Sequence, residues 1–151
     1  MRHPAHDYLG GGYFVTFTTH NRIPILSSLR SANLDIKPAG RIVHALWESL
    51  PEYYPGVMLD AFITMPDHVH CIIILTQPKL LNQKGKVKPL PEVIRGFKSM
   101  SSRQINKLFN RTGVPVWQEG YHDRVIRNDR ELDSFRQYIV TNPIRVDMKS
   151  N

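Results

Sequence analysis

Residues Met65–Leu75, MPDHVHCIIIL, carry the most informative pattern of this sequence. The second half of the segment is a short apolar run rich in β-branched residues, which is typical of a buried strand. Side chains alternate across a strand with a period of two, so His68 and His70 are expected on one face. Ile72 and Ile74 follow them on that face, and the remaining residues of the run line the other.

Two histidines on one side of an apolar strand suggest a metal site, because imidazole nitrogens on a rigid support are common ligands of divalent ions. The His-x-His spacing is short, however, and arises easily by chance. A pair of hydrogen-bonded histidines at a strand end, with no chemical role, explains it equally well. The rest of the chain has to decide between the two interpretations.

Three further extended segments are predicted around this strand. Gly10–Gly12 precedes an aromatic and β-branched run, 13–19, which predicts the first strand. The polar residues 20–22 and the Ile-Pro-Ile-Leu segment 23–26 after it are expected to form a loop. Residues 57–64 predict a strand that enters 65–75 through the tight connection Met65-Pro66-Asp67, as an antiparallel hairpin. Residues 121–126 predict another short strand.

The first predicted helix runs from about Pro38 to Tyr54, where apolar residues recur at spacings of three and four. Pro51, Pro55 and Gly56 are expected to end it.

Two further helices are predicted, one from about 91 to 110 and one that starts at Asn128-Asp129 and is stopped by Asn142-Pro143. The basic, proline-containing segment 77–91 between strand and helix is expected to be a mobile loop. The element order is strand, helix, strand, strand, helix, strand and a final helix. It predicts an α+β fold, a ferredoxin-like (RRM-like) antiparallel sheet with two helices on one face and the other face free for a ligand.

The composition is that of one globular domain spanning residues 1–151, with 41% hydrophobic and 22% charged residues. The net charge of +7 favours binding to nucleic acid, although a merely basic surface explains it equally well. The one cysteine, Cys71, excludes an intramolecular disulfide and is expected to be a small buried hydrophobe. No run approaches the roughly 18 apolar residues of a membrane span, and no secretory signal is recognised, so a cytoplasmic protein without membrane contact is expected.

The last predicted helix carries Tyr138 and Asn142, four positions apart and therefore on one face. A tyrosine beside a divalent metal is a candidate nucleophile, and an amide oxygen is a suitable ligand for Mg²⁺ or Mn²⁺. Taken alone, Tyr138 is better explained as a half-buried aromatic.

In combination, five segments resemble the REP-associated tyrosine transposases, a group within the single-tyrosine HUH transposases of small bacterial insertion sequences. They occur in the same order over nearly the whole chain: 11–25, MPDHVH at 65–70, IRGFKS at 94–99, 116–128, and YIVTNP at 138–143. The His-x-His element is weak alone but specific together with Tyr-x-x-x-Asn-Pro downstream of the Trp-Gln segment.

The resemblance implies a metal-dependent single-strand DNA endonuclease and strand transferase that cuts near DNA hairpins through a 5′-phosphotyrosine. It implies that His68 and His70 bind Mg²⁺ or Mn²⁺ and that Tyr138 is the nucleophile. Asn142 stands where relatives place a third polar ligand, often glutamine. Tyr138 would act on its own chain in a monomer or on a partner subunit in a homodimer.

The implied partner is single-stranded DNA with hairpin elements, either REP-like or formed by inverted repeats. Arg95, Lys98, Arg124 and Arg127 are candidate phosphate contacts, although solubilising surface charges explain them as well. Two other functions remain open from the residues themselves. One is a module that holds DNA or RNA hairpins without cutting, and the other is a metal-dependent hydrolase that acts through water.

Overall fold

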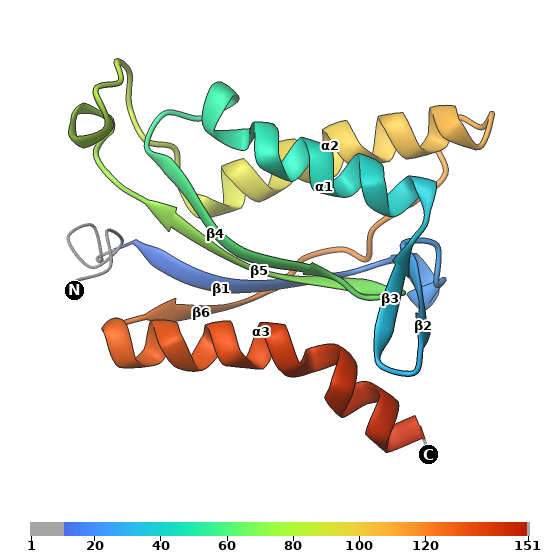
Figure 1. The fold of residues 1–151 in the computed structure, drawn as a ribbon. Coiled ribbons are helices and arrows are strands. Elements are labelled where there is room, and N and C mark those ends of the chain that lie inside the picture. The colour runs from blue at the N-terminus through green and yellow to red at the C-terminus, as the bar shows by residue number, and fades with distance from the viewer. Residues whose placement is uncertain (1–10, 151) are drawn as a thin grey trace.

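The computed structural model describes residues 11–150 and contains a four-stranded antiparallel sheet (Figure 1). Its strands are β1 (Gly12–Thr18), β4 (Val57–Thr64), β5 (His68–Leu75) and β6 (His122–Ile126). They lie in the order β4-β5-β1-β6, and every neighbouring pair is antiparallel. With the order of the helices this is the ferredoxin-like arrangement, so the fold predicted from the sequence is confirmed.

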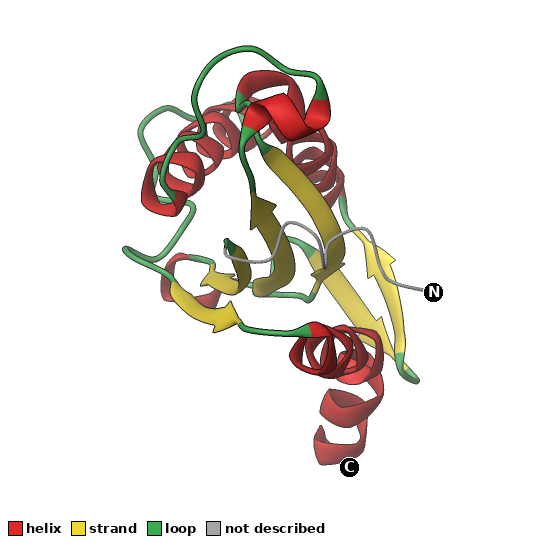
Figure 2. Cartoon of the chain, turned by 90° about the vertical axis from the view of Figure 1, so that its left-hand side faces the viewer, coloured by secondary structure: helices red, strands yellow, loops and turns green. Residues whose placement is uncertain are grey.

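Helices cover both faces of the sheet (Figures 1 and 2). The helices α1 (Pro38–Tyr53) and α2 (Leu90–Leu108) lie on one face, and α3 (Asp129–Ser150) lies on the other. The α1 helix starts at a proline, whose fixed φ suits the first helical position. The helix ends at Tyr53, within one residue of the predicted end, and Pro51 lies inside its last turn.

The larger core lies between the sheet and the α1–α2 layer. It takes alternate residues of β1 and β5 and the inner sides of both helices: Val15, Phe17, Val69, Cys71, Ile73, Val43, Trp47, Leu50, Val93 and Phe97. Cys71 is fully buried there, as expected. This set of β5 residues confirms the predicted alternation, since His68 and His70 must then face α3.

The smaller core lies between the sheet and α3. Ile72, Ile74 and Ile126 from the sheet pack against Leu132 and Ile139 of the helix. The expectation that this face is free for a ligand is therefore wrong at the end of β5 that carries the isoleucines. The other end, which carries the histidines, opens into a cleft.

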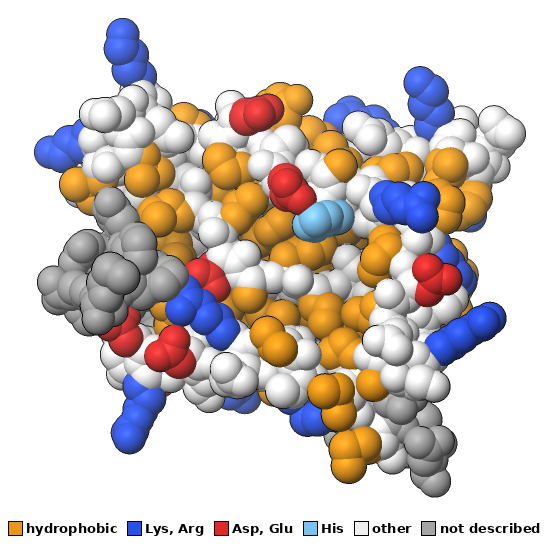
Figure 3. Space-filling view, viewed as in Figure 1, with side chains coloured by type: hydrophobic (Ala, Val, Ile, Leu, Met, Phe, Trp, Pro, Cys, Tyr) orange, Lys and Arg blue, Asp and Glu red, His pale blue; other side chains and the backbone are white. Residues whose placement is uncertain are grey.

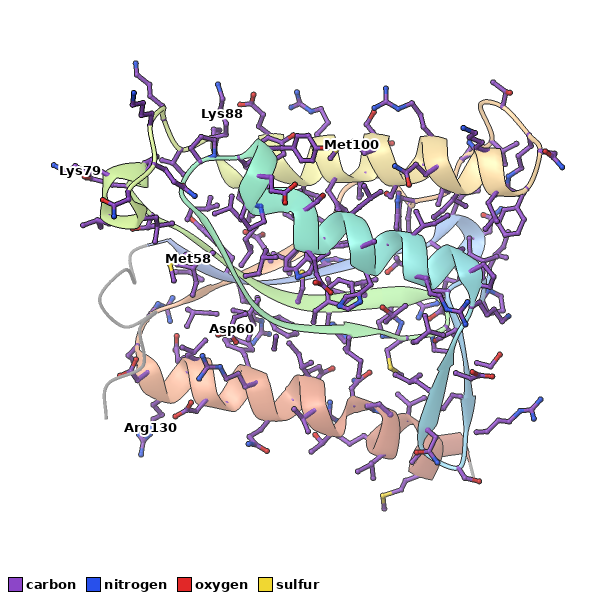
Figure 4. All side chains as sticks on the ribbon, turned by 45° about the horizontal axis from the view of Figure 1, so that its top comes forward. Met58, Asp60, Lys79, Lys88, Met100 and Arg130 are labelled. Atoms are coloured by element: carbon purple, nitrogen blue, oxygen red, sulfur yellow. The ribbon has the colours of Figure 1, made fainter. Side chains whose placement is uncertain are left out.

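A two-pronged ion pair also fixes α3 to the sheet. Arg136 donates from Nε and Nη2 to the two carboxylate oxygens of Asp60, at 2.8 and 2.5 Å. Asp60 lies at the irregularity of β4, where the pairing register with β5 shifts, and it faces α3 (Figure 4). Because Tyr138 lies two residues beyond Arg136, this contact fixes the position of α3 close to the site.

Pro143 does not stop α3, contrary to the prediction. Proline removes one backbone donor and bends a helix without necessarily ending it. The helix continues to Ser150 and bends toward its C-terminus (Figure 1). Beyond the proline, Arg145 donates from Nη2 to the Tyr138 carbonyl at 2.6 Å and from Nη1 to the Thr141 hydroxyl, which links the last turns to the preceding ones.

The sequence did not predict the two-stranded sheet of β2 (Ser27–Arg30) and β3 (Asn33–Ile36). Its turn residues, Ser31 and Ala32, both have positive φ, of 48° and 64°, as a tight hairpin turn requires. Neither is glycine or asparagine, so the usual signal is missing. The predicted loop at 20–26 contains the short 3₁₀ turn η2 (His20–Arg22), and that at 77–91 contains η3 (Pro78–Leu81) and ends in the first two residues of α2. None of the helices within 11–150 has the length and apolar character needed to cross a membrane.

Candidate active site

The two histidines of β5 lie side by side at the open end of the α3 face, with their ring centroids 4.8 Å apart. Thr16 of β1 pairs with His70 on one side and with His122 of β6 on the other. Cross-strand partners project from the same face, so these three side chains form a row across the sheet. Sequence patterns did not single out His122, because its strand is short and reaches the histidines only through pairing with β1.

Both imidazoles make a short hydrogen bond through Nδ1. His68 Nδ1 bonds the Asp67 carboxylate, and His70 Nδ1 bonds the Thr16 hydroxyl, each at 2.7 Å. Metal-binding histidines usually donate one ring N–H to such a partner and bind the ion through the other nitrogen. The network therefore leaves both Nε2 atoms suited to a metal ion.

The environment of His70 favours the neutral ring that metal binding requires. Burial, followed by the positive charges of His68 and Arg145, lowers its pKa to about 4. The imidazole is thus unprotonated at neutral pH even without a metal.

Tyr138 of α3 lies against His70, with the two rings edge to face and their centroids 5.4 Å apart. Phe14 supports both residues, since its ring stacks on His70 and meets Tyr138 edge-on. Tyr138 is 44% exposed, which leaves it accessible from solvent. A second unpredicted residue, Arg145, lies over the Tyr138 ring with its guanidinium carbon 4.0 Å from the centroid. It was missed because the helix was expected to end before it.

Asn142 lies one turn after Tyr138 and is 4% exposed. Its Oδ1 is buried and has no hydrogen-bond partner within the described chain. A buried carbonyl oxygen without a partner is unfavourable unless something else satisfies it. Its position in the same cleft as the histidines makes a cation a suitable partner.

The cleft that contains these groups has a volume of about 420 Å³. It is lined by Thr16, Thr18, Arg22, His68, His70, Gln118, His122, Tyr138, Asn142, Arg145 and Val146. Within residues 11–150 no three His, Cys, Asp or Glu side chains cluster closely enough to hold a metal ion by themselves. A metal bound here would therefore need the amide of Asn142, water or a phosphate to complete its ligands.

The predicted phosphate contacts divide between two regions. Arg124 lines a neighbouring cleft of about 520 Å³ that also includes His70 and Tyr138. Arg127 is exposed, with Nη1 4.0 Å from the Glu131 carboxylate. Arg95 and Lys98 lie on α2, across the sheet from the histidines.

Lys98 is partly engaged within the protein. Its Nζ donates to the backbone carbonyls of Gln118, at 3.0 Å, and Gly120. Burial lowers its pKa, and the nearby Glu119 opposes this. The structure thus brings Arg124 to the site and leaves Arg95 and Lys98 on the other layer.

Residues 52–142 match the family model described as "Transposase IS200 like". An uncharacterized protein of Haemophilus influenzae is 29% identical over 147 residues, which cover 89% of this chain and 81% of that protein.

Two solved structures share the fold. A REP-associated tyrosine transposase bound to a REP hairpin superposes with a TM-score of 0.66 at 20% identity, covering 96% of this chain and 74% of that one. A putative transposase from Deinococcus radiodurans superposes with a TM-score of 0.56 at 18% identity, covering 93% of this chain and 97% of that one. Because the family model spans more than half of the sequence, this chain belongs to the IS200-like transposase family.

Proposed function

We propose that this chain is a metal-dependent endonuclease and strand transferase that cuts single-stranded DNA beside a hairpin through a 5′-phosphotyrosine. The observation that carries the proposal is the convergence of Tyr138, His68, His70 and the unpartnered Asn142 oxygen on one cleft. Membership of a transposase family supports the same chemistry.

The donor set suits Mg²⁺ or Mn²⁺. Nε2 of His68, Nε2 of His70 and Oδ1 of Asn142 would hold the ion, with water and phosphate oxygens as the other ligands. When bound, the ion would neutralise charge on the scissile phosphate and orient it for in-line attack. The residues of the chain fit this role because both Nδ1 atoms are occupied and the amide oxygen has no other partner.

Tyr138 supplies the nucleophile. Its phenolic oxygen attacks the phosphorus, and a bond to the 5′ phosphate forms as the bond to the 3′ oxygen breaks. The proton lost by the phenol is balanced by the one that the leaving 3′ oxygen takes up. A second 3′-hydroxyl then reverses the step and joins new ends without a nucleotide cofactor. The contact of Tyr138 with His70 of its own chain favours action in cis.

The proposed substrate is an unpaired strand, because the scissile phosphate has to reach a cleft bordered by β1, β5 and α3. Stiff duplex DNA does not bend into such a space, whereas a flexible flank of a hairpin does. The net charge of +7 and Arg124 beside the site favour a polyanion. On the face seen in Figure 3, Lys and Arg side chains project around the margin, and Asp and Glu side chains lie among them. The hairpin bound by the structural relative supports a hairpin partner here.

A strand-labelling experiment tests the reaction. The chain is incubated with Mn²⁺ and hairpin oligonucleotides taken from inverted repeats flanking its gene, and the products are separated on a denaturing gel. We expect DNA labelled at its 3′ end to migrate with the protein, because the 5′ phosphate of that fragment is joined to Tyr138. DNA labelled at its 5′ end should be released with a free 3′-hydroxyl.

The same gel separates the alternatives. Cleavage without any protein-linked DNA would indicate a hydrolase that acts through water. Binding of the hairpin without cleavage, under every metal tested, would indicate a passive hairpin-binding module. Either result would overturn the strand-transfer proposal.

A further inference from the structure

We propose that Asp67 and Arg22 form a positioning pair that fixes His68 as a metal ligand. The inference rests on the proposed function, because it assumes that His68 binds the ion. In this proposal neither Asp67 nor Arg22 contacts the ion or the reacting atoms. Their role is to hold the His68 ring in one orientation and one tautomer.

The Asp67 carboxylate bridges the two residues. One oxygen bonds His68 Nδ1 at 2.7 Å, and the other accepts from Arg22 Nε at 3.1 Å. The Asp67 and His68 side chains are largely buried, whereas that of Arg22 is 66% exposed. The carboxylate is therefore held between an imidazole inside the cleft and a guanidinium at its rim.

The backbone around Asp67 is fixed independently of His68. Its carbonyl oxygen accepts from the backbone N–H of Thr19 at 2.9 Å and from the Thr19 hydroxyl at 3.1 Å. The Pro66 carbonyl accepts from Leu26 N–H at 3.1 Å. Thr19 is fully buried. The segment after β1 thus holds the connection between β4 and β5 on both sides of the carboxylate.

The conformation of Arg22 is a further sign that its position matters. Asn21 and Arg22 both lie in the left-handed region, with φ of 56° and 55°. Residues other than glycine rarely adopt this backbone conformation, and it persists only where the surrounding structure enforces it. Here it accompanies a side chain that reaches Asp67 and lines the cleft of the histidines.

The chemical consequence concerns the tautomer of His68. A carboxylate at Nδ1 places the proton on that nitrogen and leaves the lone pair on Nε2 for the cation. The negative charge also makes the ring a stronger donor. His70 has only the neutral Thr16 hydroxyl at the same position. The two proposed ligands thus have different hydrogen-bond partners at Nδ1: a charged carboxylate for His68 and a neutral hydroxyl for His70.

Mn²⁺ affinity of the full chain, measured by calorimetry at one fixed pH, tests the pair. We expect Asp67→Ala to weaken binding by about 10- to 100-fold. Asp67→Asn keeps an acceptor but loses the charge, so its loss should be smaller, and Arg22→Gln should also lose less than Asp67→Ala. The matched control is Asp35→Ala, an exposed aspartate on β3, whose affinity should equal that of the unmodified chain.

A second readout does not depend on metal. Nitrogen NMR of the metal-free chain at alkaline pH should show His68 protonated on Nδ1, and Asp67→Ala should shift it toward the Nε2–H form. Asp67→Asn should keep the Nδ1–H form, and a folded far-UV spectrum excludes a loss of structure.

Unchanged affinity and tautomer in Asp67→Ala would overturn the proposal. Unchanged values in Arg22→Gln would remove Arg22 from it. If the unmodified chain binds no Mn²⁺, or binds it equally after His68→Ala, the proposed metal site itself fails. The tautomer measurement then still decides whether Asp67 orients the ring.

Discussion

The ring of Tyr138 lies edge-on against the ring of His70, with the two centroids 5.4 Å apart. If Tyr138 is the nucleophile, Tyr138→Phe should abolish both cleavage and the protein–DNA adduct, since only the hydroxyl is lost. Hairpin binding should stay within about twofold, because the aromatic contacts with His70 and Phe14 remain. A denaturing gel and a filter-binding titration measure the two properties. An adduct of normal yield in this variant would exclude Tyr138 as the nucleophile.

The buried oxygen of Asn142 predicts opposite effects on stability and metal binding. Asn142→Leu removes a polar atom that has no partner, so the metal-free chain should keep its free energy of unfolding or gain about 1 kcal/mol. If Asn142 is a metal ligand, saturating Mn²⁺ should stabilise this variant less than the unmodified chain, because one ligand is gone.

Asn142→Asp is the matched variant. It keeps a ligand oxygen and should keep the stabilisation by Mn²⁺, while the buried charge lowers the metal-free stability. Denaturant unfolding with and without Mn²⁺ measures both variants. A marked loss of metal-free stability in Asn142→Leu would show that the oxygen has a partner in the folded protein.

Much of the fold could be predicted from the spacing of apolar residues and from the glycine and proline residues near the ends of elements. The alternation of β5 predicted which side chains face each layer, because a one-residue slip would turn His68 and His70 into the core beneath α1 and α2. The hairpin β2–β3 was missed because Ser31 and Ala32 adopt positive φ without the residues that normally signal it. Pro143 was misjudged because a bend and a stop have the same local signature.

The site was predictable only where neighbouring residues of one element carry it. His68 and His70 share a strand, and Tyr138 and Asn142 share a helical face, so their spacing is visible in the sequence. Three other residues of the cleft come from elsewhere in the fold. Strand pairing brings in His122, and a turn with positive φ brings in Arg22. Arg145 reaches the cleft because α3 continues beyond Pro143. Such placement depends on tertiary structure, which local patterns do not encode.

The lowered pKa of His70 predicts that the free energy of unfolding falls at acid pH. Its pKa is about 4 in the folded chain, below the ordinary value of 6.5 that it regains on unfolding. The unfolded state therefore binds the proton first as the pH falls, so stability is lost between 6.5 and about 4. The loss should be on the order of 3 kcal/mol. Urea unfolding at a series of pH values should show this slope in the unmodified chain and a shallower one in His70→Gln. Equal slopes in the two proteins would contradict the conclusion that the lowered pKa of His70 causes the loss of stability.

The ion pair between Arg136 and Asp60 predicts how firmly α3 is held. Both side chains are mostly buried, and hydrogen bonding to Asp60 raises the pKa of Arg136. Asp60→Ala removes the buried carboxylate that Arg136 contacts through both Nε and Nη2, so it should cost about 2 kcal/mol, below the range for fully buried pairs. Asp133→Ala is the matched control, because Asp133 contacts the same arginine but is 73% exposed. Its cost should stay under about 0.5 kcal/mol.

Loosening this anchor should also affect the chemistry. Arg136 precedes Tyr138 by two residues, so movement of α3 displaces the phenol from the histidines that it faces. Hydrogen exchange should therefore accelerate along α3 in Asp60→Ala, and the yield of covalent adduct should fall at temperatures where the chain is still folded. Asp133→Ala should change neither measurement. Normal adduct yield in an Asp60→Ala chain whose α3 exchanges rapidly would mean that the position of Tyr138 is set by the DNA rather than by this contact.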